Sequence, residues 1–157
     1  MLSLINTTSI KLDYKIRLIN TEEAYIIRHS VLRVGKPIES CAFDGDNLET
    51  TFHFGIFLKN DLIGVCTFLK NSNNLITETS QYQLRGMAIL EKFQKKGLGN
   101  VILNYGENFL KTKNTQIIWC NAREKASNFY KKSHYKIIGN PFNIKEIGIH
   151  YIMYKVL

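Results

Sequence analysis

The sequence predicts a mixed α/β protein in which helices cover both faces of one sheet. Short segments of alternating or uniformly apolar residues, typical of strands, are interleaved with segments whose apolar residues recur at helical spacing. A short basic loop with two glycines, Gly97 and Gly99, lies between one such strand and the helix that follows it. The length of 157 residues fits a single domain, 1–157, in which residues 1–11 form a loose leader or an edge segment.

Charge and composition narrow the function classes. Hydrophobic residues make up 45% of the chain, as in an ordinary globular protein. Lys and Arg outnumber Asp and Glu by 21 to 13, an excess that could serve nucleic acid, an anionic surface or an anionic cofactor. The lysines are spread along the chain, without a run of five like charges. We therefore expect a solvated basic surface, and nucleic-acid binding is the less favoured alternative.

The cysteines and the N-terminus indicate a reduced, cytoplasmic protein. Cys41, Cys66 and Cys120 fit neither a disulfide framework nor the spacing of a zinc site, so no metal is predicted. Cys66 and Cys120 lie within apolar strands and are expected to be buried thiols. The chain begins without the basic flank and cleavage pattern of a signal peptide, and it contains no apolar run long enough for a membrane span.

The first elements are one strand and one helix. A weakly alternating strand is expected at 14–19. Asn20 can cap the next helix, and Glu23 is placed to complete a variant of the capping box. This helix should end near residue 33, with Arg28 on its solvent-exposed surface. Its buried face should comprise Ala24, Ile27 and Val31.

The segment 34–49 breaks the pattern and predicts an irregular loop. The cluster Asp44-Gly45-Asp46-Asn47 lacks the later glycine and glutamate positions of a calcium-binding EF-hand loop. A turn is the default interpretation. The alternative is an acidic lip that would attract a cationic substrate.

A hairpin and a central strand follow. Strands are expected at 50–58 and 62–69, joined by a turn at 59–61. The central strand at 81–89 is expected to alternate regularly. One face should carry Tyr82, Leu84, Gly86 and Ala88, and the other Gln83, Arg85, Met87 and Ile89.

The second half of the chain predicts two more helices and three more strands. The apolar stripe of the long helix after Gly97 should comprise Leu98, Val101, Ile102, Tyr105 and Phe109. A strand is expected from 115 or 116 to 120, a helix at about 123–132, and the last strands at 135–138 and 147–154. The second helix should bury Ala126, Phe129 and Tyr130.

The basic glycine loop suits a phosphate-bearing ligand. Free backbone N–H groups and the positive end of the helix dipole meet where Gly97 and Gly99 open the long helix, and glycine lets a ligand approach the backbone. Lys95 and Lys96 add positive charge at the same place.

The run Gln94-Lys95-Lys96-Gly97-Leu98-Gly99 resembles the Q/R-x-x-G-x-G/A signature of the GCN5-related N-acetyltransferases, the GNAT superfamily. The segment 117–135, with Asn121, Ala126 and Tyr130, resembles the next strand and helix of that family. The resemblance implies a mostly antiparallel sheet of six to seven strands that binds acetyl-CoA. It also implies that Met87 and Ile89 present main-chain groups to the pantetheine arm, and that Asn121 or Asn128 contacts the arm or the ribose. The cofactor-binding residues expected on this basis are Met87, Ala88, Ile89, Gln94, Lys95, Lys96, Gly97, Leu98, Gly99, Asn100, Asn121, Asn128 and Tyr130.

By the same resemblance, Tyr130 is the candidate acid that protonates the departing thiolate. The general base stays open. Some relatives carry a glutamate on the central strand where this chain has Gln83, and the candidates elsewhere are His53, His150 and Glu146. A water chain without a dedicated base would also serve. The segment 146–153 resembles a C-terminal segment of a small bacterial branch that is similar to ElaA.

Two positions depart from the family pattern. Arg123 stands where the family's helix often begins with asparagine, and His134-Tyr135 replaces the usual Gly-Phe. We predict an acetyl-CoA-dependent N-acetyltransferase that acts by direct attack on a small-molecule, peptide or protein amine. The alternatives are an acyltransferase with another acyl-CoA or acceptor, and a CoA-binding regulatory module without catalysis. Cys120 is not expected to act as a nucleophile. The sequence leaves the oligomeric state undecided between a monomer and an assembly such as a homodimer, and no membrane partner is expected.

Overall fold

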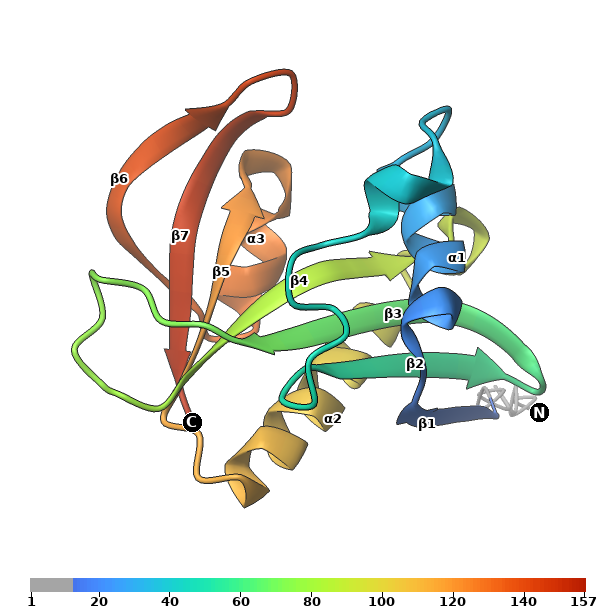
Figure 1. Ribbon diagram of the computed structural model, residues 1–157, viewed down its shortest axis with the longest axis horizontal. Helices are drawn as coiled ribbons and strands as arrows, with labels where there is room; N and C mark the ends of the chain where they lie inside the picture. The colour runs from blue at the N-terminus through green and yellow to red at the C-terminus, as the bar shows by residue number, and fades with distance from the viewer. Residues whose placement is uncertain (1–12) are drawn as a thin grey trace, which may run out of the picture.

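The computed structural model describes residues 13–157, which form one seven-stranded sheet with the strand order β1-β2-β3-β4-β5-β7-β6 (Figure 1). All neighbouring strands are antiparallel except β4 and β5, which are parallel. The predicted mixed, mostly antiparallel sheet is therefore confirmed. The strands are β1 (Tyr14–Leu18), β2 (Phe52–Leu58), β3 (Asp61–Lys70), β4 (Gln81–Ile89), β5 (Ile117–Arg123), β6 (Lys136–Ile144) and β7 (Gly148–Val156). The predicted leader, 1–11, lies outside the described residues.

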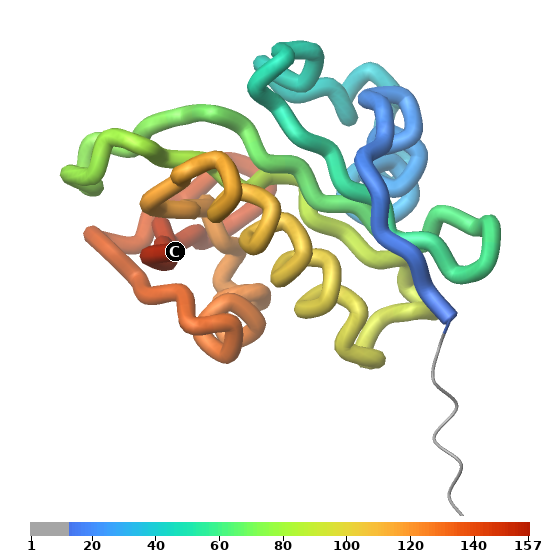
Figure 2. Tube along the Cα trace, turned by 90° about the horizontal axis from the view of Figure 1, so that it is seen from below, coloured from blue at the N-terminus to red at the C-terminus, as the bar shows by residue number. Residues whose placement is uncertain are grey.

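Helices cover both faces of the sheet, as the views in Figures 1 and 2 show. Helix α1 (Thr21–Leu32) packs on one face against a small core that includes Val65 and Ala88. Helices α2 (Leu98–Thr112) and α3 (Ser127–Lys132) pack on the other face in the main core. None of the helices within residues 13–157 has the length and apolar character needed to cross a bilayer.

The predicted capping box at the start of α1 is present. The Asn20 side chain accepts a hydrogen bond from the backbone N–H of Glu23 at 2.8 Å, and the Glu23 carboxylate accepts one from the Asn20 N–H at 2.9 Å. The two interactions satisfy two of the donors that a helix start leaves unpaired. Both residues lie close in sequence, which is why this boundary could be predicted.

Arg28 is not on the surface of α1, as the sequence had indicated, but is fully buried. Its guanidinium forms a double ion pair with Asp46, at 2.6 Å and 3.0 Å, and donates to the Cys41 carbonyl at 2.9 Å and the Thr67 hydroxyl at 2.8 Å. Asp46 therefore faces inward, and its carboxylate does not form the acidic lip considered as an alternative. The ion pair with Asp46 offsets the cost of burying the Arg28 charge. It also holds the segment after α1 against the sheet.

His53 belongs to the same buried network. Its Nε2 lies 2.8 Å from the Asp46 carbonyl oxygen, which can only accept, so Nε2 carries the proton. Its Nδ1 lies 2.8 Å from the Thr67 hydroxyl and accepts the hydroxyl proton, because the single proton of the neutral ring is on Nε2. Burial lowers the pKa of His53 and keeps the ring neutral.

The central strand β4 contains a bulge that overturns its expected regular alternation. Val65 pairs with Ala88 and Thr67 with Arg85, so two residues of β4 lie opposite the single residue between them on β3. Gly86 adopts the left-handed conformation there, with φ of 58°, which glycine allows without strain. Beyond the bulge the faces exchange. Met87 consequently packs with the main core on the α2 side, and Ala88 with the core under α1.

The buried stripe of α2 is rotated from the expected one. Leu98 and Ile102 are buried as predicted, but Tyr105 is 45% exposed. Gly106 lies directly against the ring of Phe68, and this close approach turns its side of the helix toward the sheet. The buried residues of α2 are Leu98, Ile102, Leu103, Gly106, Glu107 and Leu110.

The remaining C-terminal elements are near their expected places. The predicted second helix is divided into a 3-10 turn, Glu124–Ala126, and α3, and it buries Tyr130 while Phe129 is half-buried. Strand β6 extends to Ile144, six residues beyond the predicted end. His134 has a φ of 70°, the left-handed conformation that explains why glycine is usual at that position.

Candidate active site

The candidate active site is a cleft of about 750 Å³ between β4 and β5. The two strands pair only from Gln81 opposite Ile117 to Gln83 opposite Trp119, and they diverge beyond this point (Figure 1). Side chains from β4, β5, α1, α2 and α3 line the space that the divergence opens. Two parallel strands that are hydrogen-bonded at one end and separated at the other thus create the cleft in the middle of the sheet.

The glycine loop forms one end of the cleft. Gly97, with φ of 79°, precedes the first turn of α2, and no atom lies within 4 Å of the position that a Cβ would occupy. Within the described part of the chain, the backbone N–H groups of Lys95 to Asn100 donate to no protein acceptor. The Gln94 side chain donates to the Ile89 carbonyl at 2.8 Å and ties the loop to the end of β4. Unpaired amides at the start of a 15-residue helix are favourable partners for an anion.

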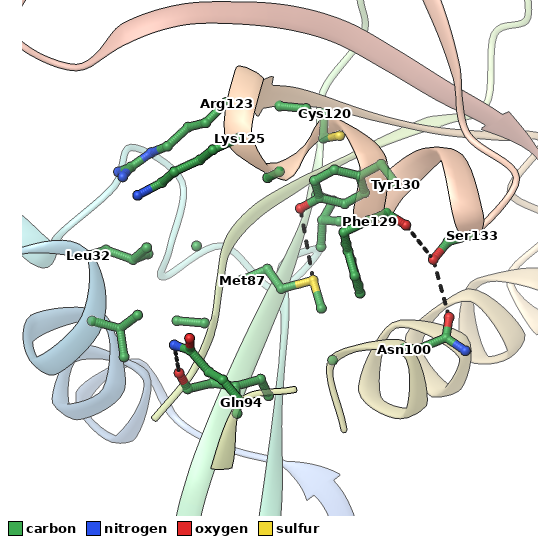
Figure 3. A pocket seen from close by; sticks show the side chains of 18 of the residues that line it. Leu32, Met87, Gln94, Asn100, Cys120, Arg123, Lys125, Phe129, Tyr130 and Ser133 are labelled. Carbon is green, nitrogen blue, oxygen red and sulfur yellow. Dashed lines mark hydrogen bonds between the residues drawn. The ribbon is translucent and has the colours of Figure 1, made fainter. Parts of the chain in front are cut away.

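Tyr130 lies at the middle of the cleft, opposite Met87 of β4 (Figure 3). Its hydroxyl points to the Met87 sulfur at 3.9 Å, a weak acceptor that leaves the proton available. The ring is fixed by edge-on contacts with Phe129 and Tyr135, at centroid distances of 5.1 Å and 5.5 Å. Burial raises the pKa of Tyr130 well above its ordinary value, so the phenol is protonated at neutral pH.

The charges that line the cleft are all positive. The lining cations are Arg33, Lys95, Arg123, Lys125 and Lys132. No carboxylate or histidine lines the cleft in the described residues, and none of these five cations has a carboxylate within 4 Å there. The site is therefore suited to anionic groups.

None of the three candidate bases lines the cleft. His53 is buried beneath the segment that follows α1, with both ring nitrogens hydrogen-bonded. His150 is 4% exposed, with Nδ1 at 2.8 Å from the Gly148 carbonyl and its ring stacked on Phe142. Glu146 lies in the turn between β6 and β7. None of the three candidate bases therefore places a carboxylate or an imidazole in the cleft beside Tyr130.

The structure brings together most of the predicted cofactor residues. Lys96 and Asn128 lie outside the lining, and Asn128 is exposed on α3. The predicted residues that line the cleft are Met87, Ala88, Ile89, Gln94, Lys95, Gly97, Leu98, Gly99, Asn100, Asn121 and Tyr130. Cys120 also lines it, but burial raises the pKa of its thiol, which disfavours a nucleophilic thiolate.

Several lining residues had no functional signal in the sequence. Arg33 and Phe43 come from the end of α1 and the irregular segment after it, which carry no motif. Lys132 and Ser133 end α3, and the Ser133 hydroxyl lies 3.2 Å from the Asn100 side-chain oxygen, which joins α3 to the start of α2 (Figure 3). Spacing alone could have located Ser133, because it follows the Tyr130 segment directly.

Comparison with known proteins agrees with this geometry. The chain is 39% identical over 143 residues to the uncharacterized N-acetyltransferase YitI of Bacillus subtilis, across 91% of this chain and 96% of that protein. The fold is similar to the ribosomal-protein-S18-alanine N-acetyltransferase of Escherichia coli, with a TM-score of 0.72, 15% identity and 92% and 94% of the two chains covered. It is also similar to Escherichia coli ElaA, with a TM-score of 0.71, 12% identity and 91% and 98% covered.

At these identities the two solved structures show the fold alone, so a closer relation to the ElaA branch stays a prediction. The model of the acetyltransferase (GNAT) family matches residues 18–135, which include the glycine loop, β5 and Tyr130. From this match and the relative at 39% identity, the chain belongs to the acetyltransferase (GNAT) family.

Proposed function

We propose that the protein is an N-acetyltransferase that moves an acetyl group from acetyl-CoA to a primary amine by direct attack in a ternary complex. The observation that carries the proposal is the row of unpaired amides at the start of α2, which opens onto a cleft that continues past Tyr130. The family membership supports the same reaction class.

The residues present fit the acyl donor. Acetyl-CoA would supply an activated acyl thioester and, at its other end, a diphosphate. The amides from Lys95 to Asn100 and the Lys95 ammonium match that diphosphate in charge and donor number. The open space at Gly97 lets phosphate oxygens approach the backbone. The main chain of Met87 and Ile89, at the edge of the diverging strands, would hold the arm between the two ends.

The chain's own chemistry is limited to positioning and one proton transfer. The acceptor nitrogen forms a bond to the acyl carbon as the carbon–sulfur bond breaks, and the excess proton on nitrogen passes to water. Tyr130 gives its hydroxyl proton to the departing sulfur and regains one from solvent. Its raised pKa keeps that proton in place until the sulfur takes charge.

Two measurements test the proposal. Saturating acetyl-CoA should raise the melting temperature, because a ligand that binds only the folded state stabilises it. Release of free thiol from acetyl-CoA in the presence of a panel of amines should then exceed release without an amine. A melting shift without thiol release would identify a CoA-binding module, and no shift would reject both readings. Acyl-CoA thioesters of increasing chain length, measured with the best amine, establish which acyl group is used.

A further inference from the structure

One end of the cleft, away from the glycine loop, carries three of the five cations that line it, Arg33, Arg123 and Lys125. In Figure 3, the side chains of Arg123 and Lys125 extend toward the side on which Leu32 of α1 lies. Asn100 and Ser133 lie on the other side of Tyr130, at the glycine-loop end. We name the first end, lined by Leu32, Arg33, Phe43, Arg123 and Lys125, the acceptor end, because the donor occupies the other in the proposed function.

Arginines gather around Phe43 at this end. The guanidinium carbons of Arg28, Arg85 and Arg33 lie 4.2 Å, 4.5 Å and 5.6 Å from the centre of its ring. Asp46 neutralises Arg28 through the double ion pair. Arg33 and Arg85 have no carboxylate within 4 Å in the described residues. Asp44 and Asp46 act on Arg85 from a longer distance, so the three arginines face two carboxylates and the group keeps a net positive charge.

Arg33 is held in place but retains hydrogen-bonding capacity. Its Nε donates to the Ser40 carbonyl at 3.3 Å and its Nη1 to the Leu32 carbonyl at 3.0 Å, and these contacts direct the side chain along the cleft wall. Its Nη2 group donates to no acceptor among residues 13–157, and the same holds for every guanidinium donor of Arg123. Two guanidinium groups with free donors thus line one end of one cleft.

This charge has opposite effects on two kinds of acceptor. A polyamine or another purely cationic amine would be repelled, and no carboxylate in the cleft would compensate. A carboxylate on the same molecule as the amine would instead form charge-assisted hydrogen bonds with the free guanidinium donors. The same cations favour the neutral form of the amine, which is the nucleophilic form, in a cleft without a side-chain base.

We propose that the acceptor is an amine that also carries a carboxylate, which Arg33 and Arg123 bind while the amino group reaches the acyl carbon near Tyr130. This inference rests on the proposed function and makes it more specific, because it names the acceptor class. Free amino acids and peptides with an acidic residue beside the amino terminus share this chemistry.

The test compares matched acceptors in the thiol-release assay. Each amino acid is paired with its carboxamide, and each acidic peptide with the peptide carrying the corresponding amide side chain. Rates are compared per neutral amine, since the amide group alters the basicity of the amino group. We expect kcat/KM to be about 10- to 100-fold higher for the carboxylate member of a pair, as one or two charge-assisted hydrogen bonds provide. The free or peptide series that shows the preference identifies the source of the acceptor.

The variants Arg123→Gln and Arg33→Gln should raise KM for the carboxylate-bearing acceptor about 10-fold and reduce the preference over the amide. KM for acetyl-CoA should change little. Lys136→Gln, which removes an exposed cation on β6 outside the cleft, is the matched control and should leave both KM values unchanged. Arg33→Gln could fail to fold, because Arg33 also donates to two carbonyls. Arg33→Lys retains the charge and is the second variant for that case.

Two outcomes would overturn the inference separately from the proposed function. Equal kcat/KM for acids and amides, with thiol release intact, would reject the acceptor class only. A rise in KM for acetyl-CoA alone in Arg123→Gln would assign that arginine to the donor and reject its acceptor role. If no amine in the panel gives thiol release, the proposed function itself is rejected, and the acceptor class with it.

Discussion

Tyr130 combines burial with a weak hydrogen-bond partner, and in the proposed function its hydroxyl acts as the general acid. Its hydroxyl is directed into the cleft and contacts only the thioether of Met87 at 3.9 Å. A phenol in such surroundings keeps its proton yet is not committed to another acceptor. We propose that this phenol protonates the departing thiolate, because it is protonated at neutral pH and its hydroxyl is directed to no strong acceptor.

We expect Tyr130→Phe to lower kcat by about 100-fold, because the substitution removes a general acid while retaining the ring. The edge-on contacts of the ring with Phe129 and Tyr135 should persist, so the melting temperature should change little. KM for acetyl-CoA should stay near its original value in the thiol-release assay. Loss of cofactor affinity with kcat unchanged would instead mean that the hydroxyl binds the donor and transfers no proton.

Asp46 and Arg28 illustrate the cost of a buried charge. Asp46→Asn should lower the free energy of unfolding by about 3–5 kcal/mol, because Arg28 would be left without its counter-charge in the interior. Urea unfolding measures this change. Asp44→Asn removes an exposed carboxylate two positions earlier and should have an effect of about 0.5 kcal/mol or less. Similar losses in the two variants would show that the ion pair contributes little.

Among the elements, the start of α2 is where we propose that the anion binds. The helix begins at Leu98 without a side-chain cap, although a capping side chain is the usual way to satisfy the first amides. Gly97 holds the left-handed conformation that turns the chain from the loop into the helix. The element is thus incomplete by itself, and an external anion would complete it.

Gly97→Ala should weaken acetyl-CoA binding, because a side chain would occupy the space above the free amides and strain the left-handed backbone. Gly35→Ala is a matched control, since Gly35 has a similar φ of 73°, with no atom within 4 Å of its Cβ position, and lies outside the cleft lining. Both variants should lose about 1–2 kcal/mol of stability. Only Gly97→Ala should raise the Kd for acetyl-CoA, measured by calorimetry. Equal Kd values in the two would argue against phosphate binding at this loop.

The bulge in β4 is the second element that shapes the site. An uninterrupted strand would place Met87 on the α1 side and leave the Tyr130 hydroxyl without its opposite wall. The extra residue at Gly86 moves Met87 to the cleft face and Ala88 to the core under α1. Gly86 also leaves room for Arg28, whose Nε would lie 2.7 Å from a Cβ at that position.

At the scale of the whole molecule, one polar network joins segments that are distant in sequence. Arg28 of α1, Asp46, His53 of β2 and Thr67 of β3 are linked by hydrogen bonds of 2.6–3.0 Å. The network holds the segment that carries Phe43 against the sheet. It thereby determines the position of one wall of the acceptor end.

Stability should fall as the pH is lowered below about 6.5, because the network requires neutral His53. Its pKa is lowered in the folded state by burial and by the nearby Arg28, so the unfolded chain binds this proton first. The stabilising contribution is complete above the unfolded pKa and is lost as the pH falls through the folded one. Urea unfolding between pH 7.5 and 5 measures how the free energy of unfolding changes with pH. The slope of this dependence should be smaller for His53→Gln than for the unmodified protein. His134→Gln, at an exposed position, should retain the original slope.

Local patterns accounted for most of the element boundaries and for the glycine loop. The cap at Asn20 depends on a residue three positions away, and the loop at Gly97 on its immediate neighbours. The burial of Arg28 could not be predicted in this way, since its partner is 18 positions distant and comes from a segment without regular structure. The bulge at Gly86 also escaped prediction, because it exists only in the register with β3.

The sequence by itself determined the fold class, the family and the glycine-bearing start of α2, because each depends on short-range spacing of residues. The tertiary structure decided which charges share the cleft, on which face Met87 lies, and that His53, His150 and Glu146 lie apart from Tyr130. These features depend on the register of strands and on the packing of an irregular segment. Such long-range geometry is set by the burial of the whole chain, and no local pattern encodes it.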